Sequence, residues 1–126
     1  MIVDSSAIIA VLRNEPESSK FRSILETHPE SYMSAGTLVE ARIMATTLNV
    51  LPELNELISE FNIRVIEVDE QQARIATVGF TKYGKGRHPA GLNFGDLFAY
   101  ALATLRDEPV LFKGSDFAKT DVKSAR

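Results

Sequence analysis

Residues 97–105 constrain the fold most strongly, because they predict a helix that is apolar on nearly every side. One threonine and the hydroxyl of Tyr100 are the only polar side-chain groups of this stretch. A helix with so little polar surface packs against other elements around most of its circumference. We therefore expect a central helix here, capped by Asn93 or Gly95, with Asp96 in its first turn.

The rest of the chain alternates short apolar segments with helical patterns. Short buried strands that alternate with helices are typical of a parallel sheet covered on both faces. In such sheets, ligands bind beyond the carboxyl ends of the strands. The expected strands are residues 1–3, 31–34, 63–68 and 110–112, and the expected helices are 7–12 (capped by Ser5 or Ser6), 17–27, 38–48, 51–61, 70–83 and 97–105.

Apolar spacing assigns a buried face to two of these helices. In residues 38–48 that face consists of Leu38, Val39, Ile43, Met44 and Leu48. In residues 51–61 it consists of Leu54, Leu57, Ile58 and Phe61, and we expect Glu53, Glu56 and Glu60 to form a solvated row rather than a binding surface. The apolar residues within 54–61 and 73–80 suit either packing inside the monomer or contact with a second copy or another protein.

Length and composition narrow the class of protein. A chain of 126 residues suits one domain spanning 1–126. It has no cysteine, so a reducing compartment is expected, and neither a secretion signal nor a membrane span is evident. We expect a soluble cytoplasmic protein without membrane contact. The chain has 14 basic and 17 acidic side chains, so any binding of nucleic acid must use a local basic patch or bound cations.

Four carboxylates stand at positions unusual for surface charges. Asp4 and Asp116 follow the first and last predicted strands, Glu40 lies in an otherwise apolar helical segment, and Asp96 opens the central helix. Each has an ordinary explanation as a helix cap, a turn residue, a surface acid or a first-turn acid. Arg42 does not share a helix face with Glu40, however, so it cannot neutralise that acid.

The four acids together indicate a metal site. Carboxylates that converge repel one another, and burial increases the cost, so such a cluster needs cations or bound protons. The chain has no thiolate and only two histidines, which leaves oxygen ligands and favours Mg²⁺ or Mn²⁺ over zinc. Metal-assisted hydrolysis of a phosphodiester is the chemistry that follows.

Four segments carry the acids in sequence order: Ile2–Ala7 (IVDSSA), Thr37–Ala41 (TLVEA), Asn93–Asp96 (NFGD) with Ala99–Ala103 (AYALA), and Phe112–Phe117 (FKGSDF). Together they resemble the PIN-domain family, and more closely the VapC ribonuclease toxins of prokaryotic VapBC toxin–antitoxin systems. The resemblance implies a three-layer α/β/α sandwich with a short central parallel sheet. It further implies a Mg²⁺-dependent endoribonuclease, usually a homodimer, that is neutralised by a small VapB antitoxin lying across the site.

The resemblance also implies roles for single residues. Asp4 and Asp96 match the main metal-binding positions, where Mn²⁺ can substitute for Mg²⁺. Glu40 and Asp116 match two further acids that complete the metal shell or position water; whether one or two metals act stays open. Asp121 resembles a supporting acid. Ser6 matches a hydroxyl position that binds either Asp4 or the substrate.

The loop Gly84–Gly91 holds the main group of basic residues. Lys85 and Arg87 are candidates for contacts with RNA phosphates, because the loop leads directly to Asp96. A solvated loop without function explains the same pattern equally well. Phe94, Tyr100 and Phe117 could stack on bases, but core packing is the stronger expectation.

Two other classes of function are alternatives to a nuclease. Phosphoryl transfer to an aspartate, in the haloacid type, needs a second acid two residues after the first, where Ser6 stands. A non-catalytic PIN-like module that binds nucleic acid or protein is the remaining alternative. Such a module has no need of all four acids.

Overall fold

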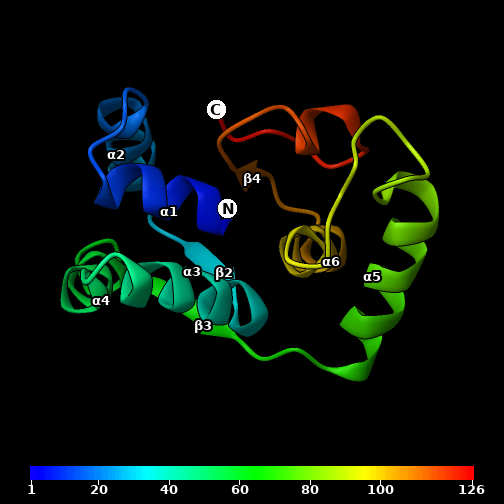
Figure 1. The fold of residues 1–126 in the computed structure, drawn as a ribbon, viewed down its shortest axis with the longest axis horizontal. Coiled ribbons are helices and arrows are strands. Elements are labelled where there is room, and N and C mark those ends of the chain that lie inside the picture. Colours follow the sequence, from blue (N-terminus) through cyan, green and yellow to red (C-terminus); the bar gives the residue numbers. More distant parts are fainter.

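The computed structural model of the protein describes residues 1–126 and contains one parallel sheet with helices on both faces (Figure 1). The strand order is β3-β2-β1-β4, and every neighbouring pair is parallel, which confirms the predicted three-layer α/β class. The elements are β1 (Ile2–Val3), α1 (Ser5–Leu12), α2 (Ser18–Thr27), β2 (Ser31–Ser34), α3 (Ala35–Thr47), α4 (Leu51–Glu60), β3 (Ile63–Ile66), α5 (Glu70–Tyr83), α6 (Asp96–Arg106), β4 (Val110–Leu111) and the 3₁₀ turn η1 (Phe117–Lys119).

The central strand β1 is buried between its neighbours and between the helical layers. Ile2 pairs with Tyr32 of β2 on one side and with Val110 of β4 on the other, and all three side chains are buried. Because every strand runs in the same direction, the carboxyl ends share one edge of the sheet. The segments that leave β1, β2 and β4 therefore begin side by side at this edge.

Two apolar cores lie on opposite faces of the sheet. Helices α1, α2, α3 and α4 enclose the first, in which Phe21 and Leu54 are buried. Burial of Leu54 and its neighbours inside the monomer accounts for the apolar stripe of α4. Helix α6 covers the other face, where Leu102 and Phe112 are buried, and α5 lies outside α6 (Figure 1).

The central helix α6 forms as predicted, and α5 packs closely against it. Residues 99–103 are buried, while Leu105 at the end of the helix is partly exposed. Gly79 of α5 makes this approach possible, because a Cβ at that position would lie 2.4 Å from the ring of Tyr100. Glycine weakens a helix, but at position 79 the close contact with Tyr100 requires it.

The buried face predicted for α3 is right for Leu38, which packs against the first core, and wrong for the other four residues. Val39, Ile43, Met44 and Leu48 are exposed to solvent, and the buried residues of this helix are Thr37, Ala41 and Ala45. Small side chains permit the close contact of α3 with α1, so most of the larger apolar residues are left on the outer surface. Periodicity alone selected the larger residues and missed the small ones that face the core.

Several element boundaries also differ from the predictions. Helix α3 begins at Ala35 rather than at residue 38, and β4 ends at Leu111 rather than at residue 112. Strand β3 ends at Ile66 rather than at residue 68, because its partner β2 ends at Ser34, which pairs with Ile66. Helix α1 is capped by Asp4, not by Ser5 or Ser6. No helix of the protein combines the length and the apolar character needed to cross a membrane.

Candidate active site

The structure brings the four predicted acids to the carboxyl edge of the sheet. Asp4 follows β1, Asp96 begins α6, Glu40 lies in α3 and Asp116 immediately precedes η1. The charges of Asp96 and Glu40 raise the pKa of Asp4, and those of Asp116 and Glu40 raise the pKa of Asp96. None of the four carboxylates forms an ion pair with lysine or arginine. Their repulsion is therefore not neutralised by the protein itself.

Asp4 is the most deeply buried of these acids, with 2% of its surface exposed. Its Oδ2 accepts hydrogen bonds from the backbone N–H of Ser6 at 3.1 Å and from the Ser6 hydroxyl at 2.6 Å. Its Oδ1 is buried without a hydrogen-bond partner. Burial outweighs the Ser6 bonds and raises the pKa of Asp4 from 3.8 to about 6, with a smaller contribution from the neighbouring carboxylates.

Ser6 connects Asp4 to the segment that follows β4. Its hydroxyl donates to Asp4 and accepts a hydrogen bond of 3.0 Å from the backbone N–H of Lys113. The Lys113 ammonium group pairs instead with Glu15, at 2.5 Å, and with Glu17, at 3.6 Å. The chain around β4 is thus anchored near Asp4 without placing a positive charge on it.

Asp96 is fixed by reciprocal hydrogen bonds with Asn93. The Asn93 backbone N–H donates to Asp96 Oδ2, and the Asp96 backbone N–H donates to Asn93 Oδ1, both at 3.0 Å. This arrangement satisfies two backbone donors at the start of α6. Burial is the largest cause of the raised pKa of Asp96, and the Asn93 N–H opposes it.

Glu40 contacts two residues that the sequence had indicated only as candidate helix caps. The Ser5 hydroxyl donates a hydrogen bond of 2.5 Å to Glu40 Oε1. Glu40 Oε2 packs on Gly95, where a Cβ would lie 1.9 Å from it. Arg42 binds Asn55 rather than Glu40, as the helix spacing indicated. The available signals were the position of Ser5 directly after Asp4 and the glycine directly before Asp96.

The remaining candidates lie apart from the acid cluster. Asp121 accepts a hydrogen bond of 2.9 Å from the Tyr100 hydroxyl and contributes to neither raised carboxylate pKa. The guanidinium of Arg87 lies 5.3 Å from the centre of the Phe80 ring, and the Lys85 backbone N–H bonds to Leu92. Neither basic side chain forms an ion pair with the acids.

The chemistry of the acid cluster fits a hard divalent cation. A buried, unpartnered carboxylate oxygen on Asp4 and the mutual repulsion among the acids are both relieved by a cation. No three acidic or histidine side chains converge tightly enough to form a complete ligand cage. Mg²⁺ commonly takes only one or two protein carboxylates and keeps several waters, so an open arrangement suits it.

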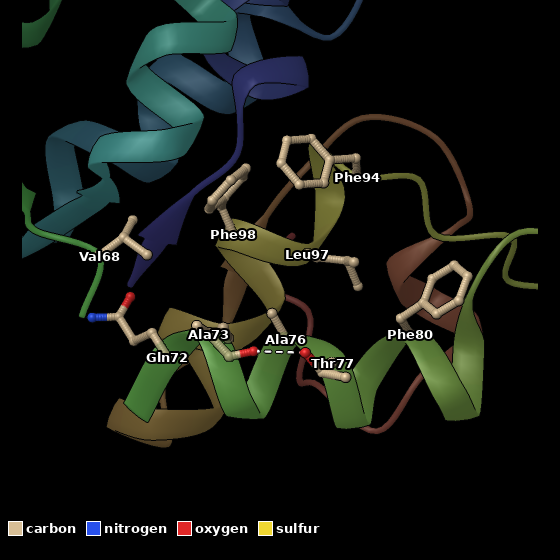
Figure 2. Close-up of a pocket in the computed structure, with 10 residues that line it drawn as sticks. Val68, Gln72, Ala73, Ala76, Thr77, Phe80, Phe94, Leu97 and Phe98 are labelled. Atoms are coloured by element: carbon tan, nitrogen blue, oxygen red, sulfur yellow. Dashed lines mark hydrogen bonds between the residues drawn. The ribbon is translucent and has the colours of Figure 1, made fainter. Parts of the chain in front are cut away.

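A separate pocket of the protein is lined mainly by apolar side chains. It has a volume of about 460 Å³, lies between α5 and α6, and contains none of the four acids. Figure 2 shows Phe94, Leu97 and Phe98 on one side of this space, with Ala73 and Thr77 of α5 below them. Its lining carries no charged side chain that could bind a phosphate or a cation.

Comparison with known proteins identifies the family. The sequence matches the PIN domain over residues 1–123. The chain belongs to the PIN-domain family. It is 43% identical over 129 residues to ribonuclease VapC28 of Mycobacterium tuberculosis, covering 99% of this chain and 97% of that protein. It is 41% identical over 130 residues to ribonuclease VapC42 of the same species, covering 99% and 98%.

Solved structures share the PIN fold of this chain. A chain of a toxin–antitoxin complex from Klebsiella pneumoniae superposes with a TM-score of 0.76 at 16% identity, covering 99% of this chain and 97% of that one. Mycobacterium tuberculosis VapC20, a toxin that cleaves the sarcin–ricin loop, superposes with a TM-score of 0.74 at 13% identity, covering 97% and 98%. At these identities the likeness concerns the fold alone.

The raised pKa of Asp4 makes stability depend on pH. A carboxyl group whose pKa is higher in the folded state favours folding when protonated, so its contribution is present below about pH 4 and lost above about pH 6. Without divalent ions, Asp4→Asn should match the wild type in unfolding free energy near pH 4. At pH 7.5 the variant should be more stable by about 3 kcal/mol. Urea unfolding at both pH values measures this, and a difference independent of pH would contradict it.

Proposed function

We propose that the protein is a Mg²⁺-dependent endoribonuclease, the toxin component of a type II toxin–antitoxin system. It hydrolyses RNA phosphodiester bonds in the cytoplasm as a single PIN domain over residues 1–126, and a VapB-type antitoxin restrains it. Full-length similarity to proteins named VapC ribonuclease supports this proposal. The observation that carries it is the convergence of Asp4, Glu40, Asp96 and Asp116 at the sheet edge without a basic partner.

The metal would be held by Asp4 and Asp96. Asp4 offers its unpartnered Oδ1, while the Ser6 bonds fix Oδ2. Burial also raises the pKa of Asp96, and hydrogen bonds with Asn93 hold this residue at the start of α6. When bound, Mg²⁺ or Mn²⁺ supplies charge to offset the scissile phosphate and lowers the pKa of a bound water.

The protein's own side chains orient the reactants. Either Glu40 or Asp116 orients the attacking water and accepts the single proton that it loses on attack. We assign Ser6 to holding Asp4 rather than to binding substrate, because its hydroxyl already donates a hydrogen bond to Asp4 and accepts one from the backbone N–H of Lys113. Lys85 and Arg87 remain our candidates for contacts with RNA phosphates, since their loop leads to Asp96.

Replacement of one metal-holding acid tests the catalytic proposal. Asp96→Asn should lower RNA cleavage in Mg²⁺ by at least about 100-fold, because charge at the metal position is lost. Asp69→Asn is the matched control, since Asp69 also lies at the start of a helix, as the N-cap of α5, but in a different part of the chain. Cleavage of a randomised RNA pool, followed by sequencing of the new 5′ ends, provides the measurement.

Two results would separate the alternatives. Normal cleavage by Asp96→Asn in excess Mg²⁺ would remove Asp96 from the mechanism. A wild-type protein that is stabilised thermally by Mg²⁺, yet cleaves no RNA, would favour the non-catalytic module.

We further propose that a second copy of the chain covers an apolar face formed by α3 and the start of α6. This face lines a groove of about 490 Å³. Val39 and Ile43 lie one turn apart and are 58% and 62% exposed, and Phe94 is 78% exposed. A surface of this kind can pair with an identical copy of itself around a twofold axis. The apolar residues of the face are Val39, Ile43, Met44, Phe94 and Phe98.

A charge on this face should prevent dimer formation. Ile43→Glu should convert a wild-type dimer into a monomer, because the interface would bury an unpaired carboxylate. Val78→Glu is the control, since Val78 is also exposed but lies on α5 outside this face. Sedimentation velocity measures both, and an Ile43→Glu protein that stays dimeric would exclude this interface.

A further inference from the structure

The first turn of α1 holds two different acids through two adjacent serines. Ser6 bonds to Asp4, its neighbour in sequence. Ser5 bonds to Glu40, which is 35 residues away on α3. Ser5 is 6% exposed, so its hydroxyl has little access to competing solvent. The catalytic proposal uses Ser6 and Glu40 but gives no role to Ser5.

Glu40 needs such a restraint for an electrostatic reason. Its charge is repelled by those of Asp4, directly after β1, and Asp96, at the start of α6. Glu40 is only partly buried, so its carboxylate is not held in place by packing alone. A flexible carboxylate would therefore turn toward water, where repulsion is weaker and hydration is better.

Gly95 holds the same carboxylate from the opposite side. Its backbone angles, φ −63° and ψ −40°, suit any L-residue, so local conformation does not require glycine here. The requirement comes from Glu40, whose Oε2 occupies the space of a Cβ. Ser5 and Gly95 thus contact different oxygens of a single carboxylate.

We infer that Ser5 and Gly95 are positioning residues that hold Glu40 beside Asp96 in the orientation needed to direct the attacking water. With Oε1 bound to Ser5, Oε2 is the oxygen that remains for water at the mouth of α6. The inference rests on the proposed nuclease function, because it concerns how Glu40 works in that reaction. Neither residue contacts the substrate in this account.

Substitutions on both sides of Glu40 test the inference. Ser5→Ala should lower the maximum single-turnover rate on a randomised RNA pool by about 10- to 100-fold, with the half-saturating RNA concentration and the melting temperature unchanged. Mn²⁺ binding, measured by electron paramagnetic resonance of the free ion, should weaken by about tenfold, because a Glu40 carboxylate that turns away no longer adds its negative charge beside Asp4 and Asp96. Ser5→Thr, which keeps the hydroxyl, should restore both quantities. Ser18→Ala is the control, because Ser18 is also a buried first residue of a helix.

Gly95→Ala provides an independent route to the same carboxylate. It should reduce the rate to a similar extent, and the Ser5→Ala/Gly95→Ala double variant should be no slower than the slower single variant, because both act through Glu40. Wild-type rate and Mn²⁺ affinity in Ser5→Ala, no rescue by Ser5→Thr, or fully multiplicative effects would each overturn the inference. If the wild type cleaves no RNA, the proposed function fails, and the Mn²⁺ titration still tests Ser5.

Discussion

Repulsion among carboxylates at one edge of a buried sheet is the constraint on which the rest of the site depends. Burial disfavours the ionised forms of Asp4 and Asp96, and neighbouring acids add to that penalty. The surrounding residues supply hydrogen bonds but no positive charge. A divalent cation supplies this positive charge. The repulsion among the carboxylates therefore lowers the stability of the metal-free protein and favours the binding of a metal ion.

The fold holds these acids through local hydrogen bonds at the ends of strands and helices. Asp4 caps α1 while its other oxygen stays unpaired, and Asp96 exchanges backbone bonds with Asn93. Ser6 joins the segments after β1 and β4, which start side by side because the strands are parallel. In each of these contacts the hydrogen-bond donor is neutral. A lysine or arginine in its place would compete with the metal for the carboxylate.

The sequence predicted the features that depend on local pattern. The apolar segment 97–105 indicated a central helix, and the acids after the first and last strands indicated one shared edge, because parallel strands place their carboxyl ends together. The exposed face of α3 was not predictable in this way. Its burial is decided by how closely α1 approaches, and Ala41 and Ala45 permit that approach while Val39 and Ile43 do not.

The contacts of Ser5 and Gly95 were also missed, for a related reason. Each joins Glu40 to an element distant in sequence. The positions of Ser5 next to Asp4 and of Gly95 next to Asp96 place both residues near the site, but they do not identify Glu40 as the partner. The acids themselves could be recognised because their chemistry is unusual for their positions. Ser5 and Gly95 are uncharged residues of ordinary type, so their chemistry does not distinguish them in the sequence.

Anomalous X-ray scattering from crystals grown with Mn²⁺ tests the central claim most directly. The account predicts manganese bound by the carboxylates of Asp4 and Asp96, and no manganese at that place in crystals of Asp4→Asn grown in the same way. Crystals of the wild type with manganese absent from this edge of the sheet, at concentrations that saturate ordinary Mn²⁺ sites, would contradict it.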